Sequence, residues 1–391
     1  MLTLIQNADL YRPAPAGKKD LLIAGQTIVK IDDRIEAPAT WDIDVIDAAG
    51  RIVCPGFVDL HVHLLGGGGE GGFATRTPEI VLSRITAAGV TTVVGCLGTD
   101  DVSRRPETLL AKARQLEAEG ISARIYTGSY QFPLATITGS VRKDVALIDM
   151  VIGVGEIAVS DHRSSAPTLD ELCRAAAEAR VGGMIGKKAG LVHLHMGSGK
   201  GGLDPVFRIV EETDIPIGQF LPTHVNRSAR LFDQALEFAR AGGNIDLTVM
   251  GESLDFARGT ADALDRALSA GVDWGQISLS SDSNGSMPVF DEKGSLVRLA
   301  VADISSLYDE FRRLVECGFS LADVLALVTE SPARRVGLAD RKGGLFVGAD
   351  ADLLVLDPEL AIDTVIARGR VMVRDGTAVV KGTFEENSVC S

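Results

Sequence analysis

Between about residues 56 and 340 the chain alternates short, β-branched apolar runs with longer amphipathic segments, and this alternation most constrains its fold. Such a pattern is typical of repeated βα units. Most runs precede a helix-like segment, and several of these begin near proline and end at glycine, as PETLLAKARQLEAEG does at 106–120. The eight runs are FVDLHVH (57–63), TTVVGCLG (91–98), ARIYTGSY (123–130), MVIGVGEIAVS (150–160), LVHLHMG (191–197), QFLPTHV (219–225), IDLTVM (245–250) and QISLSSDS (276–283).

Eight parallel strands with crossover helices close most naturally into a (β/α)₈ TIM-type barrel of ~250 residues. We therefore expect an α/β fold with this barrel over residues 56–340. Residues 1–55 and 341–391 differ, because both consist of short strand-like pieces separated by turns. Neither half alone buries enough apolar surface to be stable, so we expect a small β-sandwich domain formed from both chain termini.

The net charge limits the possible binding partners, and the cysteine content indicates the cellular compartment. Lys and Arg number 39 and Asp and Glu 53, which gives a net charge of −14 and argues against nucleic acid or an anionic membrane surface as a partner. The five cysteines are widely spaced without a CxxC pair, which fits a reducing cytoplasm. We see neither a signal peptide nor a membrane-spanning segment, so we expect a soluble cytoplasmic protein.

Imidazoles and carboxylates gather at the predicted C-terminal strand ends, where barrels of this type carry their functional groups. A single histidine there is more often structural than a ligand, and we interpret His162 and His193 in that way. The joint occurrence is more informative, because nitrogen and oxygen donors on five strands suit zinc or a similar divalent ion. The candidate metal ligands are His61, His63, Glu156, His195, His224 and Asp282.

These residues also carry a family resemblance. The run PGFVDLHVH, the later single histidines, SSD on the eighth strand and the closing GADADLLVLDPEL resemble the amidohydrolase superfamily. Within it, GGGGEGG, TRTPE, LGTD, TGSY, TGSV, SDHRSSAP, HMG, LPTHVNR and SSDSNGS resemble the isoaspartyl (β-aspartyl) dipeptidases over almost the whole chain. The resemblance implies a metallohydrolase that cleaves dipeptides linked through the aspartyl side chain, with two zinc ions per subunit and a homo-oligomeric, typically octameric, assembly.

The chain departs from the family pattern at Glu156, where the family usually has a lysine carboxylated by CO₂ that bridges both metals. A glutamate preserves the −1 charge but places its carboxyl carbon three bonds closer to Cα, a shortfall of up to roughly 3–4 Å. Gly153 and Gly155 would allow a closer backbone approach. We expect Glu156 to bridge the metals without a carboxylated lysine; the alternatives are that it binds one ion or only caps a weakened site.

The resemblance also implies roles for other residues. Asp282 would serve as general base and acid toward metal-bound hydroxide, and Tyr130 would donate a hydrogen bond to the scissile carbonyl. Arg163 and Arg227 would hold substrate carboxylates, for which a guanidinium is well suited. Further substrate contacts match Glu70, as partner of the α-ammonium group, and Gly68, Thr99 and Ser286.

Two other functions stay open on the sequence alone. Another amidohydrolase, such as an N-acyl amino acid deacylase or an amino-sugar deacetylase, would also have a carboxylate on the fourth strand. A non-enzymatic scaffold on the same fold would have lost its metal ligands, whereas here only the bridging residue is replaced.

Overall fold

The computed structural model describes residues 2–38, 40, 42–249, 255–290 and 296–385. Met250 of the seventh predicted run lies outside the described residues, as do Cys390 and the rest of 386–391 at the end of the predicted terminal domain. None of the described helices is long and apolar enough to cross a membrane.

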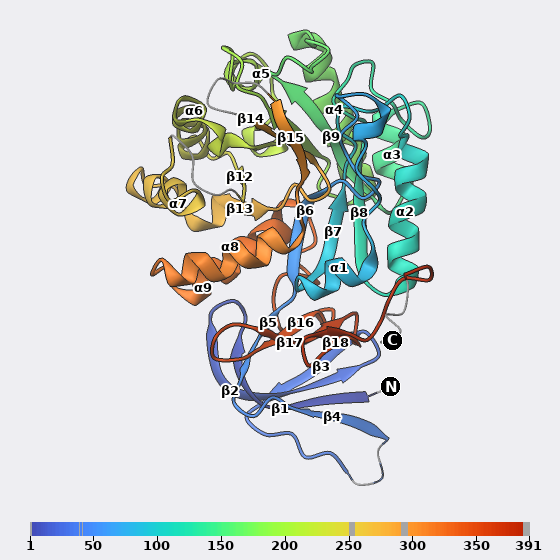
Figure 1. Ribbon diagram of the computed structural model, residues 1–391, viewed down its shortest axis with the longest axis vertical. Coiled ribbons are helices and arrows are strands. Elements are labelled where there is room, and N and C mark those ends of the chain that lie inside the picture. The colour runs from blue at the N-terminus through green and yellow to red at the C-terminus, as the bar shows by residue number, and fades with distance from the viewer. Residues whose placement is uncertain (1, 39, 41, 250–254, 291–295, 386–391) are drawn as a thin grey trace.

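All eight predicted runs form parallel barrel strands (Figure 1). Six make one hydrogen-bonded sheet in the order β11-β10-β9-β8-β7-β6, and the other two, β12 and β13, pair with each other. A parallel bridge between Val62 and Ser283 places the end of β13 beside β6. The strands are β6 (Phe57–Val62), β7 (Val90–Gly95), β8 (Ser122–Thr127), β9 (Val151–Val159), β10 (Leu191–Met196), β11 (Phe220–Thr223), β12 (Ile245–Thr248) and β13 (Ile277–Ser280).

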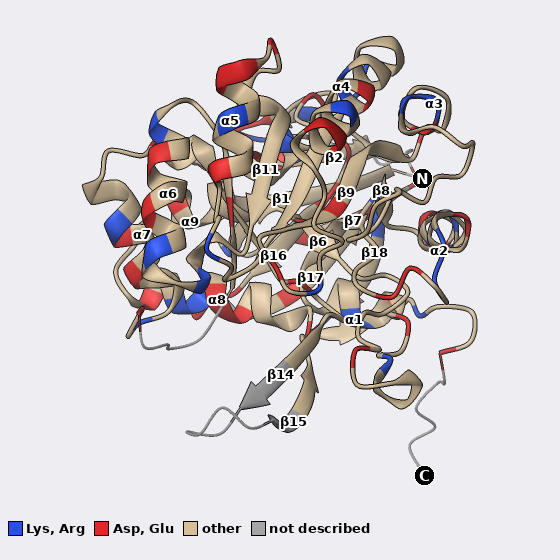
Figure 2. Cartoon of the chain, turned by 90° about the horizontal axis from the view of Figure 1, so that it is seen from above, with Lys and Arg blue, Asp and Glu red and all other residues tan. Residues whose placement is uncertain are grey.

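Amphipathic helices surround these strands and turn their charged faces outward, as Figure 2 shows for α2, α6 and α8. Their apolar faces join the strands in one large core, whereas a smaller cluster that includes Leu60, Val94, Cys96 and Tyr126 fills the barrel interior. The helices are α1 (Leu82–Ala87), α2 (Pro106–Glu119), α3 (Val141–Leu147), α4 (Leu169–Gly186), α5 (Asp204–Glu212), α6 (Ala229–Arg240), α7 (Thr260–Ser269), α8 (Ser305–Glu316), α9 (Leu321–Val328) and α10 (Glu330–Arg335).

The two chain ends combine in a sheet of nine described strands below the barrel (Figure 1). Its order is β19-β18-β17-β16-β5-β1-β2-β3, with β4 paired to β1, and the antiparallel pairing of β16 with β5 joins the two ends. The strands are β1 (Leu2–Tyr11), β2 (Pro15–Ala24), β3 (Thr27–Asp32), β4 (Ile43–Asp47), β5 (Ile52–Pro55), β16 (Leu353–Leu356), β17 (Ile362–Ala367), β18 (Arg370–Arg374) and β19 (Thr377–Ala378).

The described strands of this terminal domain form one sheet that curls over its own apolar core. A β-sandwich would have two separately hydrogen-bonded sheets. Thr27 at the far edge bridges to Asp350, and the Ile28 N–H donates to the Ala349 carbonyl at 2.9 Å, so β3 returns to the segment that precedes β16. Apolar side chains from both chain ends fill the curl. Since β5 continues through Gly56 into β6, the domain lies at the N-terminal end of the barrel strands, opposite the mouth where functional groups are expected.

Two local features differ from the sequence-based expectation. The third, sixth and eighth runs end earlier as strands, so Tyr130, His224 and Asp282 lie in the loops just beyond them. His224 and Asp282 have left-handed backbone conformations, with φ of 60° and 52°, which are incompatible with a continuing strand. In addition, an unpredicted antiparallel pair, β14 (Ser286–Phe290) and β15 (Leu296–Val301), projects from the body (Figure 2).

Candidate metal centre

The six predicted metal ligands converge at the C-terminal mouth of the barrel. All but Asp282 are at most 4% exposed, and the Asp282 side chain is 21% exposed. The alternation of side chains along β6 turns His61 and the following His63 to the same interior side. The ligands come from five strands or the residues directly after them: His61 and His63 from β6, Glu156 from β9, His195 from β10, His224 from β11 and Asp282 from β13.

The Glu156 carboxylate lies between two pairs of imidazoles. Its Oε1 atom is 2.8 Å from His195 Nδ1 and 3.2 Å from His224 Nε2. Its Oε2 atom is 3.1 Å from His61 Nε2 and 3.7 Å from His63 Nε2. One carboxylate therefore offers a separate oxygen to each pair, which is the arrangement that a bridging ligand requires.

Asp282 closes the side of the centre nearest the solvent. Its Oδ1 atom is 3.3 Å from His61 Nε2 and 3.1 Å from His63 Nε2. Nevertheless, His61 Nε2 and Asp282 Oδ1 are buried atoms that make no hydrogen bond of acceptable geometry. Because buried polar atoms are normally paired, two orphaned atoms that face the same cluster fit a divalent cation between them.

Two glycines of β9 next to Glu156 pack directly against β10. A Cβ on Gly153 would lie 2.3 Å from the Leu191 carbonyl oxygen, and one on Gly155 would lie 2.7 Å from the His193 Cβ. Only glycine fits at these positions, since real Cβ atoms do not approach so closely. The two glycines thus allow a close backbone contact between β9 and β10 beside Glu156.

The charges in the centre are strongly coupled. Burial lowers the pKa of His61, but the facing charges of Glu156 and Asp282 raise it by more, so the net pKa lies well above the ordinary value. Burial raises the pKa of Glu156, but His61 and His195 lower it well below its usual range, so the carboxylate is ionised. Burial, with a contribution from Arg227, lowers the pKa of His224 to about 3 and keeps it neutral, the form in which imidazole binds metals.

Outer groups orient two of the imidazoles. Thr248 Oγ1 lies 2.6 Å from His224 Nδ1, and Asp161 Oδ2 lies 3.1 Å from His195 Nε2. Asp161 also accepts hydrogen bonds from Arg163 Nε and Nη2, both at 3.0 Å. Each of these imidazoles is thereby held with its other nitrogen toward Glu156, as is usual for metal-binding histidines.

The predicted substrate residues lie around the same mouth. The Tyr130 hydroxyl is 2.6 Å from His195 Nδ1, and Arg163 Nη1 is 3.3 Å from Glu70 Oε1. Thr99 Oγ1 donates to the same Glu70 oxygen at 3.3 Å. Three further predicted residues complete the rim: Arg227, whose Nη1 is 3.4 Å from His195 Nε2, and Gly68 and Ser286, where a Cβ added to the glycine would lie 3.3 Å from the Ser286 Cβ.

Sequence reasoning missed Cys96 and Asp161. Cys96 directly follows β7, and its Sγ is 3.7 Å from His63 Nδ1. The signal was present, because the second run, TTVVGCLG, also ends at the mouth. Asp161 was part of the motif SDHRSSAP but received no role. The two remaining histidines differ in position: His193 is buried next to His61, at 4.8 Å between ring centroids, and stacks on Tyr126 at 4.8 Å, whereas the His162 side chain is 89% exposed.

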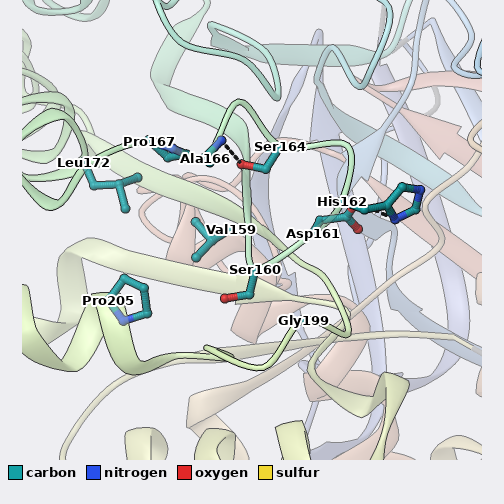
Figure 3. A pocket seen from close by; sticks show the side chains of 10 residues that line it. All are labelled: Val159, Ser160, Asp161, His162, Ser164, Ala166, Pro167, Leu172, Gly199 and Pro205. Atoms are coloured by element: carbon teal, nitrogen blue, oxygen red, sulfur yellow. Dashed lines mark hydrogen bonds and ion pairs between the residues drawn. The ribbon is translucent and has the colours of Figure 1, made fainter.

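A cavity of about 400 Å³ lies behind the loop that follows β9 (Figure 3). Asp161 and His162 border it on the loop side, and Leu172 and Pro205 border it from α4 and α5. None of the six predicted metal ligands is among its described lining residues. Asp161 therefore borders this cavity and also contacts His195 of the candidate metal centre.

The Amidohydrolase family model matches residues 52–372, which include all six candidate ligands. The chain belongs to the amidohydrolase family. Among solved amidohydrolase-type structures, it is similar to the β-aspartyl dipeptidase of Fervidobacterium islandicum AW-1 in complex with the β-Asp-Leu dipeptide. The identity is 46%, the TM-score is 0.90, and the match covers 97% of this chain and 98% of that one. The expected resemblance to isoaspartyl dipeptidases is confirmed.

A more distant solved structure shares the fold, and a curated protein matches part of the sequence. A dihydropyrimidinase from Brevibacillus agri NCHU1002 has a TM-score of 0.69 at 19% identity, over 98% of this chain and 97% of that one. A curated dihydroorotase from Streptococcus pyogenes is 34% identical over 165 residues, which span 41% of this chain and 35% of that protein's length. The comparisons support the expectation of a hydrolase on an amidohydrolase barrel.

Proposed function

We propose that this amidohydrolase is a metal-dependent dipeptidase that hydrolyses β-aspartyl (isoaspartyl) dipeptides. The observation that carries the proposal is the position of Arg163, Arg227 and Glu70 beside the buried donor set. A β-aspartyl dipeptide has a free α-ammonium group and two carboxylates next to its amide bond, so it needs both signs of charge at the site. The 46% identity to a dipeptidase solved with β-Asp-Leu supports the same substrate class.

We propose that the centre holds two zinc ions. His61 and His63 would hold one, His195 and His224 the other, with Glu156 between them and Asp282 on the first. Two of the four donor groups among the described residues contain Glu156, one with His61 and His63 and one with His195 and His224, in support of this division. Bound divalent ions would supply a water molecule of lowered pKa and polarise the amide carbonyl.

The chain's own residues orient the substrate and move the proton. Asp282, partly exposed at the mouth, accepts a proton from the attacking water and returns it to the leaving amine. Burial and the Glu156 charge raise the pKa of Tyr130 well above its ordinary value, so its hydroxyl stays protonated and can donate to the carbonyl oxygen. Arg163 and Arg227 hold carboxylates, and Glu70 pairs with the ammonium group.

The substrate experiment measures hydrolysis of β-Asp-Leu and α-Asp-Leu by the purified, metal-loaded protein. We expect cleavage of β-Asp-Leu with α-Asp-Leu left intact. The reverse preference would contradict the proposal, and turnover of only N-acyl amino acids, N-acetylated amino sugars or dihydroorotate would assign the chain to another amidohydrolase activity. A protein that binds no metal and cleaves none of these compounds would be a scaffold.

We also propose that Glu156 acts without CO₂. Activity toward β-Asp-Leu is expected to be the same after bicarbonate depletion, and Glu156→Ala to lose metal that added bicarbonate does not restore. Strong stimulation of the wild type by bicarbonate would instead point to a carboxylated lysine, with Lys187 or Lys188 to be tested first.

We further propose that the protein is a homo-oligomer in the cytoplasm, by analogy with the octamers of the dipeptidase family. Light scattering of the purified protein would give the number of subunits, and a monomer at micromolar concentration would contradict the proposal.

A further inference from the structure

Cys96 lies in the metal centre although no role has been assigned to it above. It is 1% exposed, and its Sγ is 3.7 Å and 4.0 Å from the two ring nitrogens of His63. The same Sγ is 4.0 Å from Glu156 Oε2. One donor atom each from Cys96, His61, His63 and Glu156 can be chosen so that all four lie within 4.8 Å of one another.

We propose that the Cys96 thiolate is a further ligand of the metal ion on the His61–His63 side. This inference rests on the metal centre of the proposed function and adds a sulfur donor to it. Zinc binds thiolate at ~2.3 Å and imidazole at ~2.0–2.1 Å, so in a tetrahedral site sulfur and nitrogen lie about 3.5 Å apart. His63 Nε2, the nitrogen that faces Glu156 and Asp282, is 4.0 Å from Cys96 Sγ, which is within about 0.5 Å of that value.

The short side chain of Glu156 explains why this chain would use Cys96 as a further ligand. Glu156 Oε2 is 3.1 Å from His61 Nε2 but 3.7 Å from His63 Nε2, so its contact with His63 is the looser one. Cys96 enters from β7, on the His63 side. With Glu156 and Asp282 it would bring three negative charges to the centre, which leave a net charge of +1 on two divalent ions.

A structural role for Cys96 is the competing explanation. Its S–H group can donate to the Val62 carbonyl at 3.8 Å, and the side chain packs with the apolar interior of the barrel. Packing does not account for the unpaired Nε2 of His61, a residue of the same donor group, because a buried nitrogen atom needs a partner. On ion binding the S–H bond is replaced by a metal–sulfur bond, and the proton is released to water.

X-ray absorption of the zinc-loaded enzyme and absorption spectra of the cobalt-loaded enzyme test the proposal directly. We expect a sulfur scatterer at ~2.3 Å from zinc, and a thiolate-to-cobalt charge-transfer band that is lost in Cys96→Ser and Cys96→Ala. Cys54→Ala is the matched control, because Cys54 is equally buried but belongs to β5, away from the centre. It should keep both signals and the metal content of the wild type.

Metal content provides an independent readout. After dialysis against a mild chelator, we expect about two ions per wild-type chain and about one in Cys96→Ala, with circular dichroism to verify folding. Two ions and β-Asp-Leu hydrolysis in the wild type without any sulfur signal would overturn the role of Cys96 alone. A wild type without bound metal would overturn the proposed function as well.

Discussion

At the residue scale, Asp161 connects the candidate metal ligand His195 with Arg163, a predicted substrate-binding residue. It contacts His195 Nε2 and binds Arg163 through both carboxylate oxygens. Burial raises the pKa of Asp161, but the hydrogen bonds from His195 and Arg163 lower it by more, so the net pKa lies well below its ordinary value. The carboxylate therefore stays ionised at neutral pH and can fix both groups.

Asp161→Asn removes this charge while keeping the side-chain size. Loss of an outer partner of a metal-binding histidine typically costs ~10–100-fold in metal affinity or activity. We expect a loss of that size in kcat/KM for β-Asp-Leu, with weaker metal retention and a higher KM because Arg163 is released. The exposed Asp170→Asn serves as control and should match the wild type. Unchanged metal content and kinetics in Asp161→Asn would show that Asp161 does not position these groups.

At the element scale, a buried carboxylate fixes α3 to the end of β8. Asp144 on α3 is fully buried and accepts from the Thr127 hydroxyl of β8 at 2.6 Å. It also accepts from the backbone N–H groups of Ile137 and Thr138, both at 2.8 Å. This network orders the loop that leads from the mouth into α3.

Asp144→Ala leaves these donors without an acceptor. An unsatisfied buried group costs about 1–3 kcal/mol, so we expect the free energy of unfolding to fall by about 3 kcal/mol in total. Urea unfolding followed by circular dichroism would measure this loss. The neighbouring Asp149→Ala, at an exposed position, should change stability by less than about 0.5 kcal/mol. Equal urea midpoints for the two variants would mean that the Asp144 network adds little.

At the scale of the whole molecule, a buried lysine joins the terminal sheet to the barrel. Lys342 Nζ donates to Ser122 Oγ at the start of β8 at 2.7 Å and pairs with Asp350 at 2.7 Å. It also pairs with Asp352, and its side chain is 5% exposed. The C-terminal segment that precedes β16 is therefore held to the base of the barrel through one cation.

Lys342→Met removes the cation from the buried Asp352 and leaves Asp350 paired only with the exposed Arg341. Breaking a buried pair from one side typically costs 3–5 kcal/mol, so we expect roughly that loss of unfolding free energy and a clearly lower Tm. Arg341→Met is the matched control, since Arg341 also pairs with Asp350 but is 57% exposed and is worth about 0–1 kcal/mol. Calorimetry of both variants would measure these losses. A loss in Arg341→Met as large as that in Lys342→Met would contradict the special role of Lys342.

The Lys342 contribution should depend on pH in a defined direction. Burial raises the pKa of Asp350, but the positive charge of Lys342 lowers it by more, so the net pKa lies below the ordinary 3.8. A lowered carboxyl pKa gives stability that is complete above the unfolded value and is lost as the pH falls through the folded value. The Tm difference between wild type and Lys342→Met should accordingly be largest near neutral pH and shrink below pH ~4.

The sequence by itself determined the architecture and the main donor set. Apolar periodicity is a local property, so the eight runs and the helices between them could be read from the chain. Parallel strands that close into a barrel necessarily bring their C-terminal ends together, so the convergence of His61 and His63 with histidines more than 130 residues away followed from topology.

Only the tertiary structure decided how the donors face one another. The position of the Glu156 carboxylate between two imidazole pairs depends on the packing of β9 against β10. The proximity of Cys96 to His63 depends on the register of β7 against β6. Neither packing nor register is encoded in local periodicity, because contacts between distant segments set both. For the same reason, the sequence predicted a β domain from both chain termini, but its single curled sheet and the Lys342 contact became visible only in three dimensions.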